Sequence, residues 1–246
     1  MELTFDWTTT EGRRASNEDA CCARPGLGLF AVADGMGGYE GGEVASRIAI
    51  ETLVGFASCL ARGDNLFLPS DVDYARPPEE NVVAAAIRLA DARIKAARVG
   101  PLAQMGSTVA MVQTIEDRVV VAHVGDSRVY RRRASKIECL TRDHSLYEEL
   151  RASGADVPPK EKFLHAHVIT RALGIETPKR DPDLRSEALA IGDTLLLCTD
   201  GVTDVLSDED IGALLDGDLA AERIASAAYD AGSRDNITVL LLRRVD

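Results

Sequence analysis

Acidic residues recur through this 246-residue chain at places where a strand is expected to end. Each stands beside glycine, asparagine or arginine, and together they are Glu18-Asp19, Asp34, Asp126, Asp200 and Asp235. The apolar run 195–199 leads straight into Asp200, so a buried strand is expected to deliver this carboxylate to the rim of the core. Carboxylates gathered in this way repel one another at low dielectric unless cations neutralise them.

The chemistry that such a group favours is the binding of hard divalent cations. Oxygen ligands without paired histidine or cysteine suit Mg²⁺ or Mn²⁺ better than zinc. Glycine follows both Asp34 and Asp200, which lets the backbone approach closely and leaves a glycine carbonyl free to bind metal. None of the four histidines has metal-ligand spacing with a carboxylate, and we interpret His144 as a structural residue.

The elements that must position these residues follow from hydrophobic periodicity. Alternation predicts a strand over 3–10, and a short apolar run predicts a buried strand over 27–33 that meets a glycine-rich turn. Helical spacing predicts helices over about 42–60 and 80–98. Further strands are expected over 108–115, 118–124, 128–132, 136–140, 184–189, 194–199 and 237–242, and further helices near 145–152, 207–216 and 218–231.

The order of these elements predicts an α+β fold. Strands come in groups and helices in pairs, which fits antiparallel sheets better than a doubly wound parallel sheet. We therefore expect two packed, mainly antiparallel sheets flanked by pairs of helices, in a single domain over 1–246. Residues 143–183 carry mixed polar sequence with two adjacent prolines, and we expect them to form an exposed excursion from the core. The run Arg131-Arg-Arg133 is expected to be a solvated strand end, with contact to an acidic or phosphorylated partner as the alternative.

Eight short motifs, in order along nearly the whole chain, resemble those of the PPM or PP2C-type metal-dependent serine/threonine protein phosphatases in their compact bacterial form. The motifs are Arg14-x-x-Asn-Glu-Asp19, Ala33-Asp-Gly-Met-Gly-Gly38, Gly106-Ser-Thr108, Val124-Gly-Asp-Ser-Arg128, Leu140-Thr-Arg-Asp-His-Ser145, Ile169-Thr-Arg-Ala-Leu-Gly174, Cys198-Thr-Asp-Gly201 and Asp235-Asn-Ile-Thr238. Singly each motif is common, but the ordered set is specific. The resemblance implies a four-layer α-β-β-α sandwich.

The resemblance also assigns residue roles, position by position. Asp34 matches the aspartate that bridges two metal ions. Asp200 and Asp235 match ligands of one ion, and Glu18 and the carbonyl of Gly35 match ligands of the other. The remaining matches are the water-positioning Asp19, the phosphate-binding Arg14, the aspartate of a weaker third metal site Asp126, and Asn236, which orients its neighbours.

The implied reaction is hydrolysis of phosphoserine and phosphothreonine. A water held between two Mn²⁺ or Mg²⁺ ions attacks phosphorus in line, while Arg14 and the metals offset charge on the phosphoryl oxygens. Some family members have a histidine two residues after the bridging aspartate that is proposed to protonate the leaving group. This chain has Met36 there, so the proton donor is open, and water at the third metal site is one hypothesis.

Composition limits the classes of molecule with which the protein is expected to interact. A formal charge of −12 opposes nucleic acid and anionic membrane, so the expected partners are phosphorylated proteins, the targets of serine/threonine kinases. Five cysteines without CxxC spacing suggest reduced thiols. Neither a signal peptide nor 18 uninterrupted apolar residues is visible, so we expect a cytoplasmic monomer.

Two other functions compete with a general phosphatase. The same fold could serve partner switching by dephosphorylating a single regulatory protein, or it could be a catalytically inactive metal-binding module. The complete set of Glu18, Asp34, Asp200 and Asp235 argues against the inactive module. The region 143–183 contains the segment that family members use as a mobile flap beside the site, and specificity is expected to lie there.

Overall fold

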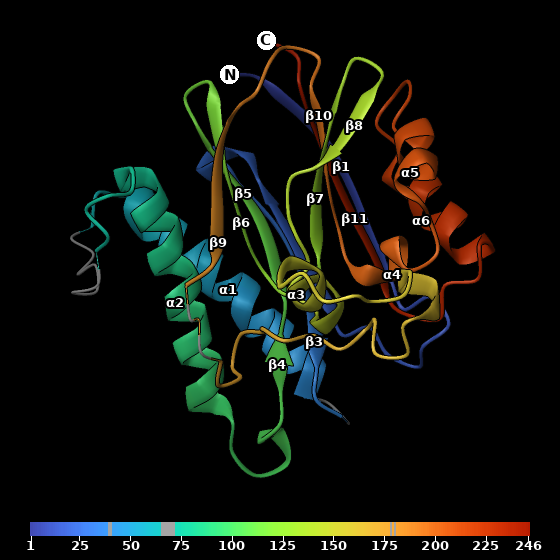
Figure 1. Cartoon of the computed structure of the whole chain (residues 1–246). Helices are drawn as coiled ribbons and strands as arrows, with labels where there is room; N and C mark the ends of the chain where they lie inside the picture. The colour runs from blue at the N-terminus through green and yellow to red at the C-terminus, as the bar shows by residue number, and fades with distance from the viewer. Residues whose placement is uncertain (39–40, 65–71, 178, 180) are drawn as a thin grey trace.

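The structure is a computed structural model that describes residues 1–38, 41–64, 72–177, 179 and 181–246. Its strands form two sheets packed face to face (Figure 1). The five-stranded sheet has the order β1-β11-β10-β7-β8, with antiparallel pairing throughout. Its strands are β1 (Leu3–Thr10), β7 (Arg128–Arg133), β8 (Lys136–Cys139), β10 (Thr194–Cys198) and β11 (Ile237–Arg244).

The second sheet has six strands in the order β2-β3-β5-β6-β9, with β4 paired to β3, and its pairs are also antiparallel. Its strands are β2 (Asp19–Arg24), β3 (Leu29–Met36), β4 (Gly106–Ser107), β5 (Val109–Ile115), β6 (Arg118–Val124) and β9 (Asp183–Ala188). The central strands are buried on both faces, which explains why they read as continuous apolar runs rather than alternating ones.

Helices cover the outer face of each sheet and complete four layers (Figure 1). The six-stranded sheet packs against α1 (Gly41–Ala61) and α2 (Pro78–Ala97), which bury an aliphatic face that includes Ala49, Leu53 and Ile87. The other sheet packs against α4 (Asp200–Thr203), α5 (Asp208–Leu214) and α6 (Ala221–Asp230). A separate apolar core lies between the sheets. The predicted α-β-β-α architecture is confirmed.

Apart from short 3-10 turns, the sequence-based prediction missed two strands and one α-helix. β2 has the sequence Asp-Ala-Cys-Cys-Ala-Arg, whose small side chains give little hydrophobic pattern, and it forms a strand because it pairs along its whole length with β3. β4 and α4 are too short to show periodicity. In addition, β3 continues past the predicted end at residue 33 to Met36, so Asp34 lies within the strand rather than after it.

By length and composition, α1 is the single helix among the described residues that could cross a membrane. In this structure it lies against the six-stranded sheet beside α2, and residues such as Ala45, Ala49 and Leu53 are fully or almost fully buried there. Its apolar composition is therefore accounted for by the core that it helps to form.

The segment 143–183 leaves the five-stranded sheet after β8 and returns to the other sheet as β9. It holds the short helix α3 (Leu146–Ala152), capped by the Ser145 side chain, and the 3-10 turn η3 (Lys160–Lys162). An isolated bridge between Ser145 and Ile169 closes its base. Residues 178 and 180 of the predicted excursion lie outside the described residues.

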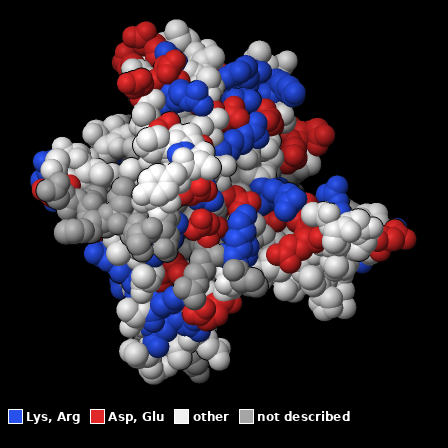
Figure 2. Space-filling model, turned by 60° about the vertical axis from the view of Figure 1, so that its left-hand side comes forward, with Lys and Arg blue, Asp and Glu red and all other residues white. Residues whose placement is uncertain are grey.

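Residues 131–133 at the end of β7 were predicted to be a solvated strand end. In the structure each of them pairs with an acidic residue of this chain, and Arg133 also stays exposed. Arg131 lies 2.7 Å from both Glu138 and Glu187. Arg132 pairs with Asp216, and Arg133 lies 2.6 Å from Asp193. Figure 2 shows the same mixing of charge across one face of the molecule, where basic and acidic side chains stand next to one another.

Candidate metal centre

Antiparallel topology brings the predicted site residues to one end of the sandwich. Asp19 begins β2 and Asp34 is directly opposite it near the end of β3. Asp200 follows β10, while Asp235 precedes β11, the antiparallel neighbour of β10. In an antiparallel pair the start of one strand adjoins the end of the next, so residues before and after strands meet. Asp126 and Asp200 follow strands as expected, but Asp34 lies within β3 and Asp19 is the first residue of β2. Glu18 and Asp235 precede strands, so the expectation was wrong for these four residues.

Hydroxyl groups hold the backbone of Asp34 in place. The Asp34 N–H donates to Oγ1 of Thr108 at 2.9 Å, and the Thr108 N–H donates back to the Asp34 carbonyl at 2.8 Å. Oγ1 of Thr108 also lies 2.7 Å from Oγ of Ser127, which follows Asp126. This buried pair of hydroxyls therefore links the segment carrying Asp34 to the segment carrying Asp126.

The carboxyl group of Asp19 is held by two buried threonines. Oγ1 of Thr199 and Oγ1 of Thr238 donate to the same Oδ2 atom, at 2.9 and 2.7 Å. Burial raises the pKa of Asp19 to about 7, although these two hydrogen bonds act to lower it. One carboxylate oxygen of Asp19 is thus fixed by Thr199, which follows β10, and by Thr238 of β11. The charges of Asp235 and Glu18 also raise the pKa of Asp19, so its carboxyl group lies near theirs.

Electrostatic repulsion identifies the carboxylates as neighbours. Burial, followed by the charge of Asp200, raises the pKa of Asp34 well above its ordinary range. Burial, followed by the charge of Asp126, does the same for the pKa of Asp200. Burial also raises the pKa of Asp126 to about 6, and its Oδ1 atom has no hydrogen-bond partner among the described residues. Mutually repelling carboxylates with an unpartnered oxygen are a donor set that fits hard divalent cations.

Glu18 and Gly35 lie together on the other side of Asp34, against the first turn of α1. A methyl group placed on Gly42 would lie 2.7 Å from the carboxyl carbon of Glu18 and 2.7 Å from the carbonyl oxygen of Gly35. The Glu18 carboxyl group and the Gly35 carbonyl, which the resemblance assigns to one cation, therefore both lie next to Gly42. The Gly35 N–H donates to the Glu18 carbonyl at 3.1 Å, which ties the two residues together.

Arg14 lies at the open side of this group. Its Nη2 atom is 2.7 Å from Oδ2 of Asp235, its Nε donates to the carbonyl of Arg234 at 3.1 Å, and its side chain is 56% exposed. The hydrogen bond to Asp235 raises the pKa of Arg14. The Asn236 side chain accepts from the Glu18 N–H at 2.9 Å and donates to the carbonyls of Glu11 and Ser16. Asn236 thus orders the turn that presents Arg14 and Glu18.

One acidic residue of this group was missed from sequence. Asp204 follows α4, and its N–H donates to the Asp200 carbonyl at 2.8 Å. Burial raises the pKa of Asp204, and its charge contributes to the raised pKa values of Asp126 and Asp200. The signal was present in Asp200-Gly-Val-Thr-Asp204, because residues four apart share one face of a helix.

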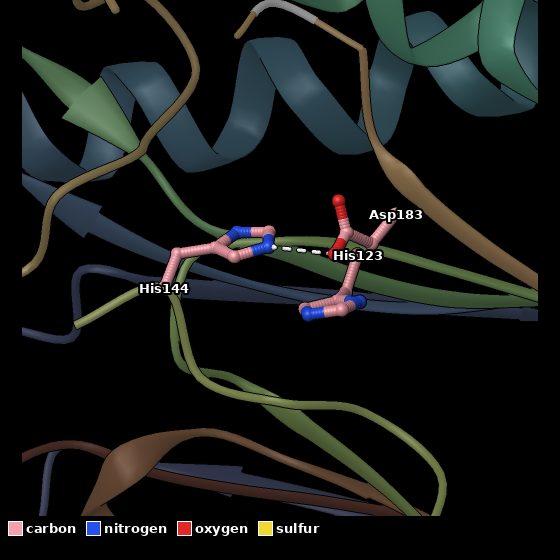
Figure 3. A group of neighbouring side chains, drawn as sticks. All are labelled: His123, His144 and Asp183. Carbon is pink, nitrogen blue, oxygen red and sulfur yellow. Dashed lines mark ion pairs between the residues drawn. The ribbon is translucent and has the colours of Figure 1, made fainter. Parts of the chain in front are cut away.

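Sequence spacing also hid a second cluster, which consists of His123, His144 and Asp183 (Figure 3). Their potential ligand atoms lie within 4.8 Å of one another. However, Nη1 of Arg171 lies 2.6 Å from Nε2 of His144 and 2.9 Å from Oδ1 of Asp183. A permanently charged guanidinium among the three side chains opposes a cation electrostatically, so we do not assign a metal to this cluster.

Comparisons with known proteins agree with the fold and the motif order. The family model described as Protein phosphatase 2C matches residues 8–219. The chain is 34% identical over 239 residues to serine/threonine protein phosphatase PstP of Mycobacterium tuberculosis, covering 95% of this chain and 43% of PstP. It is 30% identical over 252 residues to protein phosphatase PhpP of Streptococcus pneumoniae, covering 98% of this chain and 97% of PhpP.

Solved structures are similar over the whole chain. The M. tuberculosis phosphatase PstP/Ppp superposes with a TM-score of 0.83 at 30% identity, covering 99% of each chain. The PstP catalytic domain in complex with two manganese ions gives a TM-score of 0.79 at 32% identity, again covering 99% of each chain. The match to a family model over most of its length, together with these relatives, shows that the chain belongs to the protein phosphatase 2C family.

Proposed function

We propose that this protein is a metal-dependent phosphoprotein phosphatase that hydrolyses phosphoserine and phosphothreonine. The observation that carries the proposal is the convergence of Glu18, Asp34, Asp200 and Asp235 beside Arg14 at one end of the sandwich. The names of the relatives, all protein phosphatases, support it. The chain spans 43% of the length of PstP, so the activity of the chain and its substrates are proposals.

The proposal gives each carboxylate a place around two Mn²⁺ or Mg²⁺ ions. Asp34 would contact both, Asp200 and Asp235 would hold one, and Glu18 with the Gly35 carbonyl would hold the other. When bound, such ions supply Lewis acidity and an activated water for in-line displacement at phosphorus. A manganese-bound structural neighbour supports this choice of metal. Asp126 and Asp200, with Asp204 beside them, would hold a weaker third ion.

The remaining residues orient the reactants. Asp19 keeps one carboxylate oxygen on Thr199 and Thr238 and has its other oxygen left to orient a water. Arg14 offers a planar fork that suits two phosphoryl oxygens. Arg14 is exposed, and among the described residues Asp235 is the one carboxylate that pairs with it, so donors remain available on the open side of the site.

Substrate selection is proposed to lie in the flap-like segment 143–183 of a single domain. One of its residues reaches the metal centre, because Nδ1 of His167 lies 3.4 Å from Oδ2 of Asp204. Within the segment itself, Lys160 lies 3.6 Å from Asp143. Lys160, His167 and Asp204 also line a hollow of about 300 Å³. A phosphoprotein chain entering this hollow would meet these side chains. We also propose that the protein acts as a monomer in the cytoplasm and that its partners are phosphorylated proteins.

The test is hydrolysis of p-nitrophenyl phosphate and of a phosphothreonine peptide with Mn²⁺, with and without chelator. Metal-dependent turnover that disappears in Asp34→Asn and Asp200→Asn supports the enzyme. Absence of turnover on both substrates by wild-type protein that binds Mn²⁺ would favour the metal-binding module instead. Activity on the small ester together with inactivity on a panel of phosphopeptides would favour a phosphatase dedicated to one regulatory protein.

A further inference from the structure

We propose that His144 is a positioning residue that fixes the backbone of Gly125 and so aims the carboxylate of Asp126 into the metal centre. This inference rests on the proposed function, because it gives His144 a part in the site where Asp126 acts. The side-chain contacts of His144 in the described part of the chain are with Gly125, Arg171, Asp183 and His123, and none of these is an acidic residue of the metal centre.

His144 contacts Gly125 through two hydrogen bonds. The His144 N–H donates to the Gly125 carbonyl at 2.9 Å, and the Gly125 N–H donates to Nδ1 of His144 at 3.0 Å. His144 is 5% exposed, so the hydrogen bond to its ring is shielded from water. Without the ring, the Gly125 N–H would be left buried and unpartnered, which is costly for a backbone donor.

The backbone at Gly125 is a conformation that needs such support. Its φ of 107° is accessible to glycine and strained for other residues. A methyl group there would also lie 2.7 Å from Cβ of Thr108. Glycine loses much conformational freedom on folding, so a glycine that must hold one conformation depends on the contacts around it. His144 provides these contacts on one side of the turn.

Asp126 depends on this backbone because little else holds its side chain. Its Oδ1 atom has no hydrogen-bond partner among the described residues, and neither an ion pair nor a hydrogen bond from another side chain holds it there. On its other side, Ser127 is held by Thr108 at 2.7 Å. The direction of the Asp126 carboxylate is therefore set by two anchors, Gly125 on His144 and Ser127 on Thr108.

His144 is in turn held by the base of the flap-like segment. Its carbonyl accepts from the Thr170 N–H at 2.8 Å, and Nε2 lies 3.4 Å from Oδ2 of Asp183. Arg171, which is 8% exposed, contacts both His144 and Asp183. The ring stacks on His123, with ring centroids 4.5 Å apart. Figure 3 shows the two rings together with Asp183. The two ends of segment 143–183 thus meet at His144, and the ring carries their position to Gly125.

Two substitutions of His144 separate the contacts of Nδ1 from those of Nε2, and a third substitution, at Asp126, serves as a reference. His144→Asn keeps a side-chain acceptor near Nδ1 and loses the contacts at Nε2. His144→Gln places its polar group near Nε2 and removes the acceptor from Gly125. Asp126→Ala removes the carboxylate itself and sets the size of effect that a misdirected Asp126 can have.

Two measurements apply to all variants: hydrogen exchange of the Gly125 amide by NMR in metal-free protein, and the Mn²⁺ concentration that gives half-maximal phosphatase activity. We expect His144→Gln to exchange at least tenfold faster at Gly125 and to need several-fold more Mn²⁺, as Asp126→Ala does. His144→Asn should remain within threefold of wild type in both. Combining His144→Gln with Asp126→Ala should add little to the shift in Mn²⁺ dependence.

The outcomes separate this inference from the proposed function. Wild-type exchange at Gly125 and wild-type Mn²⁺ dependence in His144→Gln would overturn the role of His144. Equal changes of both measured quantities in His144→Asn and His144→Gln would also overturn it. The acceptor at Nδ1 would then make no difference, and the ring would act through packing alone. A wild-type protein that neither takes up Mn²⁺ in electron paramagnetic resonance titrations nor hydrolyses phosphate esters would instead overturn the proposed function.

Discussion

Asp19 and Asp34 are paired directly across the antiparallel strands β2 and β3, with both carboxyl groups at the same end of the sheet. Directly opposed like charges destabilise a sheet. Here burial raises the pKa of both groups, and the charge of Asp19 adds to the effect on Asp34. The fold thus carries an unfavourable arrangement that bound cations would relieve, and the first prediction follows from it.

Replacing the central carboxylate should have opposite effects on stability and activity. Asp34→Asn keeps the shape and removes one charge, so metal-free protein at pH 8 should melt a few degrees higher, about 1 kcal/mol of relieved repulsion. Phosphatase activity with Mn²⁺ should fall by at least about 10³-fold, on the scale of losing a principal electrostatic contribution. Thermal melting with chelator and p-nitrophenyl phosphate assays measure both. A variant that melts lower than wild type without metal would contradict the repulsion.

Two glycines of α1 form a matched pair for testing the Glu18 side of the centre. Gly42→Ala would push on the Glu18 carboxyl and the Gly35 carbonyl, whereas a methyl group on Gly55 meets nothing within 4 Å. Both substitutions favour helix by up to about 1 kcal/mol. We expect Gly55→Ala to raise the melting temperature with activity kept, and Gly42→Ala to weaken Mn²⁺ affinity about tenfold or more. Calorimetric Mn²⁺ titration distinguishes them, and equal affinities would place Glu18 and Gly35 outside the metal centre.

Neighbouring arginines test the phosphate-binding role. Arg14→Ala removes a charge-assisted contact to the phosphoryl group and should lower kcat/KM roughly 10- to 100-fold, as expected for about 1.5–3 kcal/mol. Arg13 stacks on Tyr229 at 4.1 Å and donates to the Ser233 carbonyl, so Arg13→Ala should change kcat/KM less than about threefold. Steady-state kinetics on a phosphopeptide compare the two. Similar losses in both variants would assign the effect to the turn rather than to phosphate binding.

His123 should make the protein sensitive to acid. Burial, followed by the charge of His144, lowers the pKa of His123 to about 4, against about 6.5 in the unfolded chain. The unfolded chain therefore takes up a proton first as the pH falls. The contribution of neutral His123 to the free energy of unfolding is therefore present above about pH 6.5 and declines below it. The decline amounts to about 2 kcal/mol between pH 7.5 and 5.

His123→Gln tests this sign. The glutamine amide can replace the contact of Nε2 with the Arg142 carbonyl, which is 2.8 Å long, and it does not titrate. His144, Arg171 and Asp183 surround the ring and are unchanged in the variant. Urea unfolding from pH 7.5 to 5 should give a shallower loss of unfolding free energy in His123→Gln than in wild type. Parallel pH profiles would show that His123 does not carry the acid sensitivity.

Most of the framework was determined by the sequence. Helical periodicity predicted α1 and α2 within a residue or two, because burying one aliphatic face of a helix requires that periodicity. Apolar runs predicted the strands β5, β6 and β10 equally closely, because these strands are buried in the core. Motif order predicted the family. The acids Glu18, Asp34, Asp200 and Asp235 could be named because each stands beside glycine, asparagine or arginine near the end of an expected strand. Arg14 could be named only because its motif resembles that of the family.

Tertiary structure alone decided what depends on pairing across long separations in the chain. β2 is a strand because β3 lies beside it, and its small side chains carry no pattern of their own. Thr199 and Thr238 reach Asp19 over about 180 and 219 residues of sequence, and His144 reaches Gly125 across two segments. Such contacts leave no local periodicity, because side chains that meet only in the folded chain constrain one another through space rather than through neighbouring residues.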